Sequence, residues 1–339
     1  QEALERGAKS PGAAHDEPVE SGKPFGYVLS ARENDAYAVA NAAKKAGCQV
    51  WRIDACPYRD FYVEGDEAVI RAAWEKTPVE VRKAGRPQGL TEVKPARVAI
   101  YQRYYGGNAE EGWMRLLLET FGFDFTSVKD ADIWGGCLKD FDVLVLPSDM
   151  PAVLEGPALH PEGFMYTMSL SQPPEYRSGL GKEGAEKIRE FVQGGGKLLA
   201  MEGSADYAIS TLDLPVRNIV KGMKAKDFNT HGSTLRVSVN AQHPLAYGMP
   251  EKTLILHWNG PVFDVTDKFH ADQYDTVVRF EKDHLLRSGL LTGEKIIAGR
   301  SVMMQAPCGK GFAVLYGFAP SKRMQTHATF KLLMNALYV

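Results

Sequence analysis

The chain has 339 residues, of which 44% are hydrophobic and 24% are charged. This length suits two ordinary domains, and the composition is typical of a globular protein rather than of a disordered one. The 40 basic and 42 acidic residues give a net charge of −2, which provides no basic field for a nucleic-acid backbone or an anionic membrane. No apolar run approaches the roughly 18 residues of a transmembrane helix.

The first 95 residues are predicted to form a tail and then a small α/β unit. Residues 1–23 contain no apolar core, which is typical of a linker or tail and of neither a signal peptide nor a membrane anchor. Residues 24–95 combine strand and helix patterns with a linker at 84–96 that has two prolines and two glycines. The predicted strands are Phe25–Leu29, Cys48–Ile53 and Phe61–Val63, and the predicted helices are Asp35–Ala46 and Asp66–Lys76.

Residues 96–339 are predicted to form a larger α/β domain. Short apolar strands alternate with helices, a pattern that indicates a doubly wound, mostly parallel sheet with ligand crevices at the carboxyl ends of its strands. The predicted strands are Val98–Tyr101, Phe125–Val128, Phe141–Leu146 and Leu198–Met201, and the helices between them are Ala109–Gly122 and Lys182–Gln193. A hairpin (Ser301–Gln305 with Phe312–Tyr316) and a helix at Met324–Tyr338 complete the domain.

Two segments interrupt this alternation. Residues 148–180 form a long excursion rich in Pro, Gly and Ser, and loops of this length usually serve function or contact a partner. Residues from about 212 to 300 show only strand-like runs, and we expect them to form a β-rich insertion.

The four cysteines, Cys48, Cys56, Cys137 and Cys308, are too few for a disulfide scaffold and lack CxxC spacing. Cys48 and Cys56 could pair in an oxidising compartment, or they could be small buried thiols.

Several motifs together resemble one known family. They are Glu110-Glu-Gly-Trp-Met-Arg, Phe141-Asp-Val-Leu-Val-Leu-Pro, Gly179-Leu-Gly-Lys-Glu-Gly, Phe191-Val-Gln-Gly-Gly-Gly and Gln325-Thr-His-Ala-Thr-Phe-Lys-Leu-Leu-Met-Asn-Ala-Leu. Over residues 24–339 the chain is similar to the C-terminal region of large bacterial zinc carboxypeptidase-like proteins, the carboxypeptidase A-type metallopeptidases. The resemblance implies a class I glutamine amidotransferase-like domain in a secreted or periplasmic protein, with a peptidase domain N-terminal to this chain.

The zinc chemistry of that family has no counterpart in these residues. A carboxypeptidase centre needs a histidine and a glutamate three residues apart, together with a second, distant histidine. None of the eight histidines has a carboxylate three residues later, and no HExxH occurs. We therefore expect neither metal nor cofactor in this chain, with zinc only in the peptidase domain.

Amidotransferase chemistry also lacks its thiol. That reaction needs a cysteine on a sharp strand-to-helix turn, where backbone N–H groups form an oxyanion hole, with a histidine and a glutamate nearby. The corresponding turn reads Glu202-Gly-Ser-Ala, so Ser204 is a candidate substitute, although Asp206 replaces the second glycine of GxSxG. His327 could pair with Ser204 or Glu202 in a triad, or it could bond only locally at the start of the last helix.

Further candidates for ligand binding lie at the predicted carboxyl edge of the sheet. The turn Tyr104-Tyr-Gly-Gly-Asn opens a helix and could cradle an anion on its free N–H groups. However, the acidic Glu110 and Glu111 that follow it would repel an anion, and they are better explained as first-turn residues that complement the helix dipole. The candidate residues are Tyr104, Gly106, Gly107, Asn108, Ser148 and Asp149.

The sequence favours a non-catalytic accessory region with a degenerate amidotransferase-like domain. Its expected partners are the peptidase domain of the same parent protein or a second copy of the chain, with no nucleic acid and no membrane span. The alternative is a hydrolase or small-ligand-binding domain that uses the crevice near Ser204 and His327.

Overall fold

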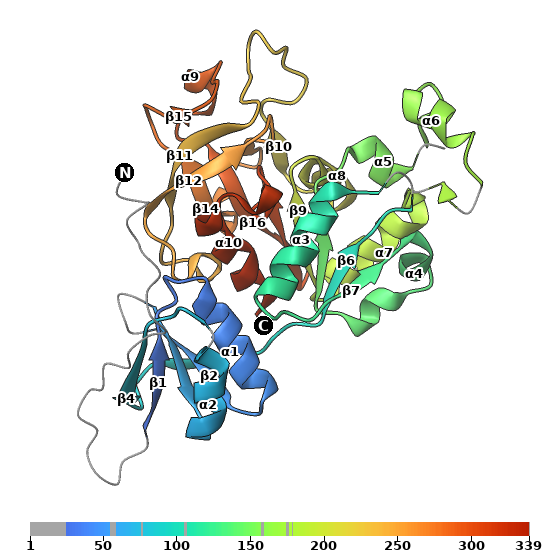
Figure 1. The fold of residues 1–339 in the computed structure, drawn as a ribbon. Coiled ribbons are helices and arrows are strands. Elements are labelled where there is room, and N and C mark those ends of the chain that lie inside the picture. Colours follow the sequence, from blue (N-terminus) through green and yellow to red (C-terminus); the bar gives the residue numbers. More distant parts are fainter. Residues whose placement is uncertain are drawn as a thin grey trace.

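A computed structural model describes residues 25–54, 59–75, 77–104, 107–156, 159–173, 176–177 and 179–338. The predicted tail at 1–23, Gly106, and Cys56 with its pairing to Cys48 lie outside these residues. Two sheets organise the described part of the chain, a small one at the lower left of Figure 1 and a large one above and to the right. The predicted α/β class, with a small α/β unit in front of a larger sheet, is confirmed.

The small unit is a five-stranded antiparallel sheet in the order β4-β1-β3-β2-β5, with two helices packed on one face. Its elements are β1 (Phe25–Leu29), α1 (Asp35–Lys45), β2 (Gln49–Ile53), β3 (Phe61–Glu64), α2 (Glu67–Trp74), β4 (Val81–Gly85) and β5 (Leu90–Glu92). Alternating residues of β1 explain the helix-covered face, because Tyr27 and Leu29 join the core under the helices while Val28 faces the other side. The predicted linker at 84–96 is wrong in part, since its residues include the end of β4 and all of β5.

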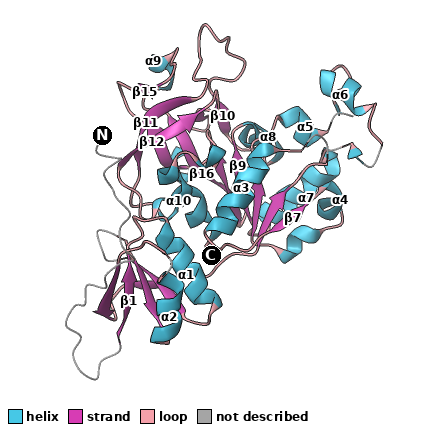
Figure 2. Ribbon diagram, in the orientation of Figure 1, coloured by secondary structure: helices cyan, strands magenta, loops and turns pink. Residues whose placement is uncertain are grey.

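The centre of the large sheet is parallel, with the strand order β7-β6-β8-β9-β17. These strands are β6 (Val98–Tyr101), β7 (Thr126–Val128), β8 (Val143–Leu146), β9 (Lys197–Met201) and β17 (Gly311–Tyr316). Their alternate residues fill two separate cores, one on each face. Figure 2 shows the strands of this sheet running between helices.

Helices cover both faces of the parallel strands. Residues of α3 (Ala109–Thr120) and α10 (Phe330–Met334) fill one core, and residues of α4 (Asp130–Trp134), α7 (Gly181–Gln193) and α8 (Gly203–Thr211) fill the other. This arrangement is the doubly wound architecture that the alternation of strands and helices predicts. None of the helices in the described part of the chain is long and apolar enough to cross a membrane.

The β-rich insertion extends the same sheet. β16 pairs antiparallel with β17 in the predicted hairpin, and the path continues through β14 and β11 to β12. The antiparallel strands are β10 (Val216–Asn218), β11 (Ser233–Val239), β12 (Lys252–His257), β13 (Phe263–Val265), β14 (Asp275–Phe280), β15 (Leu286–Ser288) and β16 (Ser301–Cys308), with the one-turn helix α9 (Glu294–Ile297) after β15. The insertion is therefore part of one continuous sheet.

Two predicted segments differ from the structure. The excursion at 148–180 contains the short helices α5 (Pro151–Glu155) and α6 (Phe164–Ser169). The helix predicted over Met324–Tyr338 is broken into 3-10 turns on either side of α10, and Arg323 and Met324 have positive φ angles of 53° and 52°. A regular helix cannot pass through residues with positive φ.

The small unit packs firmly on the large one, and Asn335 is the centre of the contact. Its side chain accepts hydrogen bonds from the Tyr37 hydroxyl and the Arg52 guanidinium, each at 2.8 Å. It donates to the carbonyl oxygens of Leu245 at 3.2 Å and Tyr247 at 2.9 Å. One hydrophobic core also runs without interruption from the small unit into the large one.

Candidate functional site

The strand order fixes where a ligand site is expected. In the order β7-β6-β8-β9-β17 the chain moves outward in one direction from β6 to β7, and in the other direction from β8 onward. The reversal lies between β6 and β8, and in open α/β sheets ligands bind outside the carboxyl ends of the strands at such a point. The turns that follow these two strands contain the candidates Asn108 and Asp149.

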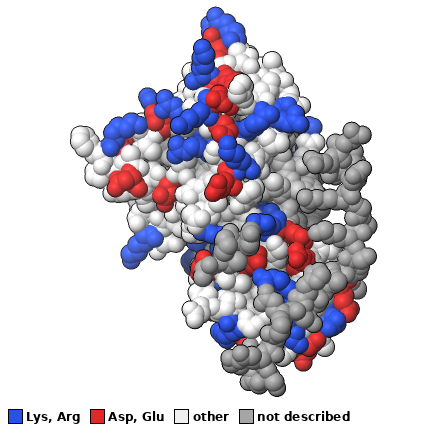
Figure 3. All heavy atoms as spheres, turned by 90° about the vertical axis from the view of Figure 1, so that its left-hand side faces the viewer, with Lys and Arg blue, Asp and Glu red and all other residues white. Residues whose placement is uncertain are grey.

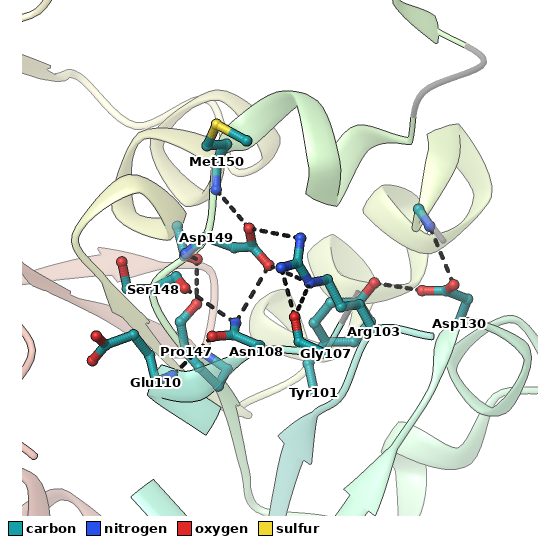
Figure 4. A network of polar contacts seen from close by, with 12 residues as sticks. Tyr101, Arg103, Gly107, Asn108, Glu110, Asp130, Pro147, Ser148, Asp149 and Met150 are labelled. Carbon is teal, nitrogen blue, oxygen red and sulfur yellow. Dashed lines mark hydrogen bonds and ion pairs between the residues drawn. The ribbon is translucent and has the colours of Figure 1, made fainter. Parts of the chain in front are cut away.

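Asp149 is the centre of a hydrogen-bond network at this point (Figure 4). The Arg103 guanidinium contacts both carboxylate oxygens of Asp149 at 3.2 Å, and Asn108 Nδ2 donates to Asp149 Oδ2 at 3.3 Å and to the Ser148 carbonyl at 3.1 Å. Arg103 also donates to the Gly107 carbonyl at 2.9 and 2.6 Å. Burial raises the pKa of the Asp149 carboxyl, and the Arg103 charge opposes this rise.

This network joins the two turns to each other. Asn108 is the N-cap of α3, because its side-chain oxygen accepts the Glu110 N–H at 3.0 Å. The structure therefore brings together four of the predicted ligand-binding residues: Asn108 bonds to Ser148 and Asp149, and Arg103 links Gly107 to Asp149. A second buried carboxylate, Asp130, accepts the Tyr101 hydroxyl at the edge of the same region (Figure 4).

Ser204 is a buried structural residue of the same edge. Its side chain is fully buried, its hydroxyl donates to the Pro147 carbonyl at 2.5 Å, and it accepts the Asp149 N–H at 3.1 Å. Both bonds tie α8 to the turn after β8. The hydroxyl proton is committed to a carbonyl, so no histidine holds it as a general base would.

Glu202, not Ser204, occupies the sharp turn between β9 and α8. Its backbone has φ 46° and ψ −118°, a strained conformation for a residue with a side chain. Gly203 is required beside it, because a Cβ there would lie 2.3 Å from the Asp149 carbonyl oxygen. A strained strand-to-helix turn is where a nucleophile elbow presents its reactive group. Of the two candidates in this turn, Glu202 and Ser204, the structure places the Glu202 carboxylate at that position.

The Glu202 carboxylate belongs to an ion cluster with Lys322 and Glu110. Lys322 Nζ lies 2.9 and 3.1 Å from the two Glu202 oxygens and 3.4 Å from Glu110 Oε1. The ammonium also lies 5.5 Å from the centre of the Trp258 ring, as does the Arg323 guanidinium. Each member of the cluster follows a strand of the parallel sheet: Lys322 follows β17, Glu202 follows β9 and Glu110 follows β6.

Glu110 has one carboxylate oxygen without a partner. Burial raises the pKa of Glu110, Lys322 lowers it, and the neighbouring Glu202 charge raises it. Among the described residues, Glu110 Oε2 is buried and has no hydrogen-bond donor. Figure 4 shows the Glu110 side chain extending away from Asp149, so the ion cluster and the Asp149 network lie on different sides of the turn.

His257 is a third polar group near this cluster. It is fully buried, and burial together with the Lys322 charge lowers its pKa to about 3, so the ring is neutral at physiological pH. Its Nδ1 shares a 2.7 Å hydrogen bond with Thr230 Oγ1, while Nε2 has no partner among the described residues. Sequence reasoning missed His257 and Lys322, because neither belongs to a motif that marks it.

His327 and Tyr104 lie elsewhere. The His327 ring stacks near Phe330, with 5.0 Å between the ring centroids, and its carbonyl accepts the Asn34 side chain from the small unit. It makes no hydrogen bond with Ser204 or Glu202 in the described structure. Tyr104 contacts Tyr176 and lies 4.2 Å below the Lys129 ammonium. Within the described ranges no group of three or more His, Cys, Asp or Glu side chains is placed to hold a metal ion.

Comparisons with known proteins place this architecture among diverse structures. No protein-family model matches the sequence, and no curated protein sequence matches it. A glutamine amidotransferase from Thermotoga maritima is 13% identical, with a TM-score of 0.38 over 72% of this chain and 95% of that one. A cytoplasmic protein from Salmonella typhimurium LT2 is 13% identical, with a TM-score of 0.43 over 72% of this chain and 100% of that one.

A β-galactosidase from Bacillus circulans sp. alkalophilus is 11% identical, with a TM-score of 0.39 over 71% of this chain and 31% of that one. With TM-scores below 0.5, these similarities carry no argument about what the chain does. The α/β architecture rests on the strand order itself.

Proposed function

We propose that this chain is a non-catalytic accessory region with a degenerate amidotransferase-like domain. The observation that supports the proposal is Glu202 on the strained turn after β9, where acyl transfer would need a thiol or hydroxyl. Its carboxylate is held by Lys322 at 2.9 Å, and the neighbouring Ser204 hydroxyl is bonded to a carbonyl. Neither group is available as a nucleophile.

The test is an assay for both amide and ester hydrolysis. We expect the protein to release ammonia from glutamine, and nitrophenol from p-nitrophenyl acetate, no faster than buffer does. Ser204→Ala and Glu202→Gln should leave these background rates unchanged. Hydrolysis above background that either substitution removes would overturn the non-catalytic assignment.

The accessory role extends the resemblance to zinc carboxypeptidase-like proteins. In this proposal the chain packs on a peptidase domain of the same secreted or periplasmic protein, or on a second copy of itself, and any zinc belongs to the peptidase domain. The exposed side chains of Leu159, Leu170 and Tyr176 on the 148–180 segment are candidates for the contact. Intact-mass analysis of the natural protein should give a mass above that of the 339-residue chain. A natural protein no larger than this chain would contradict an attached peptidase domain and leave a second copy of the chain as the partner.

Small-ligand binding at the carboxyl edge is the second candidate. Glu110 Oε2 and His257 Nε2 are both buried without partners in the described structure, and a donor-rich ligand would satisfy the carboxylate. Thermal unfolding with L-glutamine as the probe tests this role. A midpoint that rises with glutamine, and that no longer rises in Glu110→Gln, would favour ligand binding.

A further inference from the structure

An open cavity of about 770 Å³ lies where the small unit meets the large one. Its walls come from three places: the turn before α1 with Arg59 nearby, the segment 241–250, and the segment that leads into α10. In Figure 1 this is the region where α1 approaches α10, and the bond from Asn34 Nδ2 to the His327 carbonyl closes one side of it. The polar residues of the lining are Arg32, Asn34, Arg59, Gln242, His327 and Lys331.

The lining is cationic. It contains two arginines, one lysine and one histidine, and among the described residues that line it none is Asp or Glu. Figure 3 shows a different pattern on the surface, where basic and acidic side chains are interspersed over the upper part of the face. Acidic groups outside the lining interact with it: the Glu33 charge raises the pKa of Lys331, and the charges of His327 and Arg32 lower the pKa values of Asp35 and Asp60 against the effect of burial.

Lys331 is the residue that this cavity leaves unexplained. It is 5% exposed, and its ammonium makes no hydrogen bond or ion pair with the described residues. Burial lowers its pKa to about 8, so most of the population remains charged at neutral pH. The Glu33 charge opposes this shift only in part. A buried charge without a hydrogen-bonded partner is costly, and natural sites normally pair it. Asn34 Oδ1, in the same lining, is also buried without a partner.

Arg59 is held in place in the same lining. Arg59 donates to the Gln242 carbonyl at 2.8 Å and to the Gln242 side chain at 3.0 Å, which fixes its guanidinium against the 241–250 segment. Met249, Pro250 and Ala328 add apolar surface to the same walls. A volume of about 770 Å³ is much larger than one inorganic anion needs, and it falls in the range of small-molecule sites.

We propose that this cavity binds a small organic anion with two or more negative charges, carried by phosphate or carboxylate groups, with Lys331 as its central cationic contact. Arg32, Arg59 and His327 surround the charged groups, and the apolar wall takes the organic part. Because the three walls belong to both units, the bound anion bridges them. This site is separate from the carboxyl edge of the sheet, so the inference does not depend on the accessory role.

Calorimetric titration with two probes tests the site. Pyrophosphate represents the phosphate source and citrate the carboxylate source, and sodium chloride at matched ionic strength is the control. We expect saturable binding of at least one probe, and the probe that binds identifies the source. Affinity should fall at least tenfold in Lys331→Met, should be retained in Lys331→Arg, and should be unchanged in Lys252→Gln, which removes an exposed lysine of β12. Binding should also weaken as the pH rises from 7 to 9, because Lys331 loses its proton.

Chemical labelling gives a second readout on the unmodified protein. With a pKa of about 8, a large share of Lys331 is the neutral, nucleophilic amine at pH 8, and a small amine reagent can reach it through the open cavity. Peptide mapping should therefore find Lys331 modified, and the bound probe should protect it. The proposal fails if neither pyrophosphate nor citrate binds beyond the salt control. It also fails if Lys331→Met binds the probe as tightly as the parent chain does.

Discussion

Replacing Lys331 with methionine is expected to stabilise the protein in the absence of multivalent anions. Lys331 is almost fully buried, and burial lowers its pKa from 10.5 to about 8. Because one pKa unit corresponds to about 1.36 kcal/mol, the buried ammonium lowers the free energy of unfolding at neutral pH by roughly 3 kcal/mol. Methionine keeps the aliphatic stem without the charge. We therefore expect the free energy of unfolding to rise by roughly 1–3 kcal/mol, part of the gain being lost to imperfect packing.

The pH dependence of this gain identifies its cause. Below pH 8 the lysine is protonated in both the folded and the unfolded chain, so the full penalty applies. Between pH 8 and 10.5 the folded state loses the proton first, and the parent chain regains stability relative to the variant. Urea unfolding of both proteins at pH 7 and pH 10 should thus give a smaller difference at pH 10. A loss of stability in Lys331→Met at pH 7, or an equal difference at both pH values, would refute the burial of the Lys331 charge as the cause.

Three further substitutions test the contacts described above. Ser204→Ala should lower the free energy of unfolding by about 1–3 kcal/mol, because it leaves the Pro147 carbonyl and the Asp149 N–H without their buried partner; Ser210→Ala, on the exposed side of the same helix, should change it little. Lys322→Met should cost about 3–5 kcal/mol at pH 7.5, since Glu110 and Glu202 then face each other unpaired. The cost should shrink as the pH falls to 5, because burial raises the pKa of Glu110 and so favours its neutral form. An equal loss at both pH values would contradict this cause. Asn335→Ala should lower the free energy of unfolding by about 2–4 kcal/mol and speed amide hydrogen exchange in the small unit. Unchanged exchange would show that the two units dock without this residue.

The parallel sheet could be predicted because its strands are buried on both faces. Phe141–Leu146 reads as a continuous apolar run, and β8 (Val143–Leu146) is buried along its whole length. The edge strands carry no such signal. β5 is exposed or half-buried throughout, so a short polar strand beside Gly89 reads as a linker in the sequence.

The apolar residues of Met324–Tyr338 are spaced to fit one face of a helix, so the sequence predicts a regular helix there. In the structure, residues 330–338 are enclosed on all sides, so periodicity gives no information about where helical geometry stops. The positive φ angles at Arg323 and Met324 break the segment and bring Lys322 to the Glu202 carboxylate. Tertiary contacts, rather than local residue preferences, therefore determine where Lys322 lies.

The turn after β9 is recognisable in the sequence, whereas the residue at its tip is not. Glu202 and Ser204 are both candidates, and local preference does not single out glutamate, which rarely adopts φ 46°. The partners of Ser204 come from Pro147 and Asp149, more than 50 positions earlier in the chain. A buried bridging hydroxyl of this kind has no sequence signature.

The contact between the small unit and residues 335–338 has a consequence for how the protein is made on the ribosome. Tyr338 donates its hydroxyl to Asn41, its backbone bridges to Pro95, and Asn335 binds Tyr37. The small unit emerges before the large one, but the residues that complete its surface are synthesised more than 240 positions after β5. At about 5–20 residues per second it waits for roughly 10–50 seconds with Tyr37 and Phe61 uncovered. During that interval the nascent chain offers an apolar surface to chaperones, and the unit acquires its final stability only when synthesis has passed Tyr338.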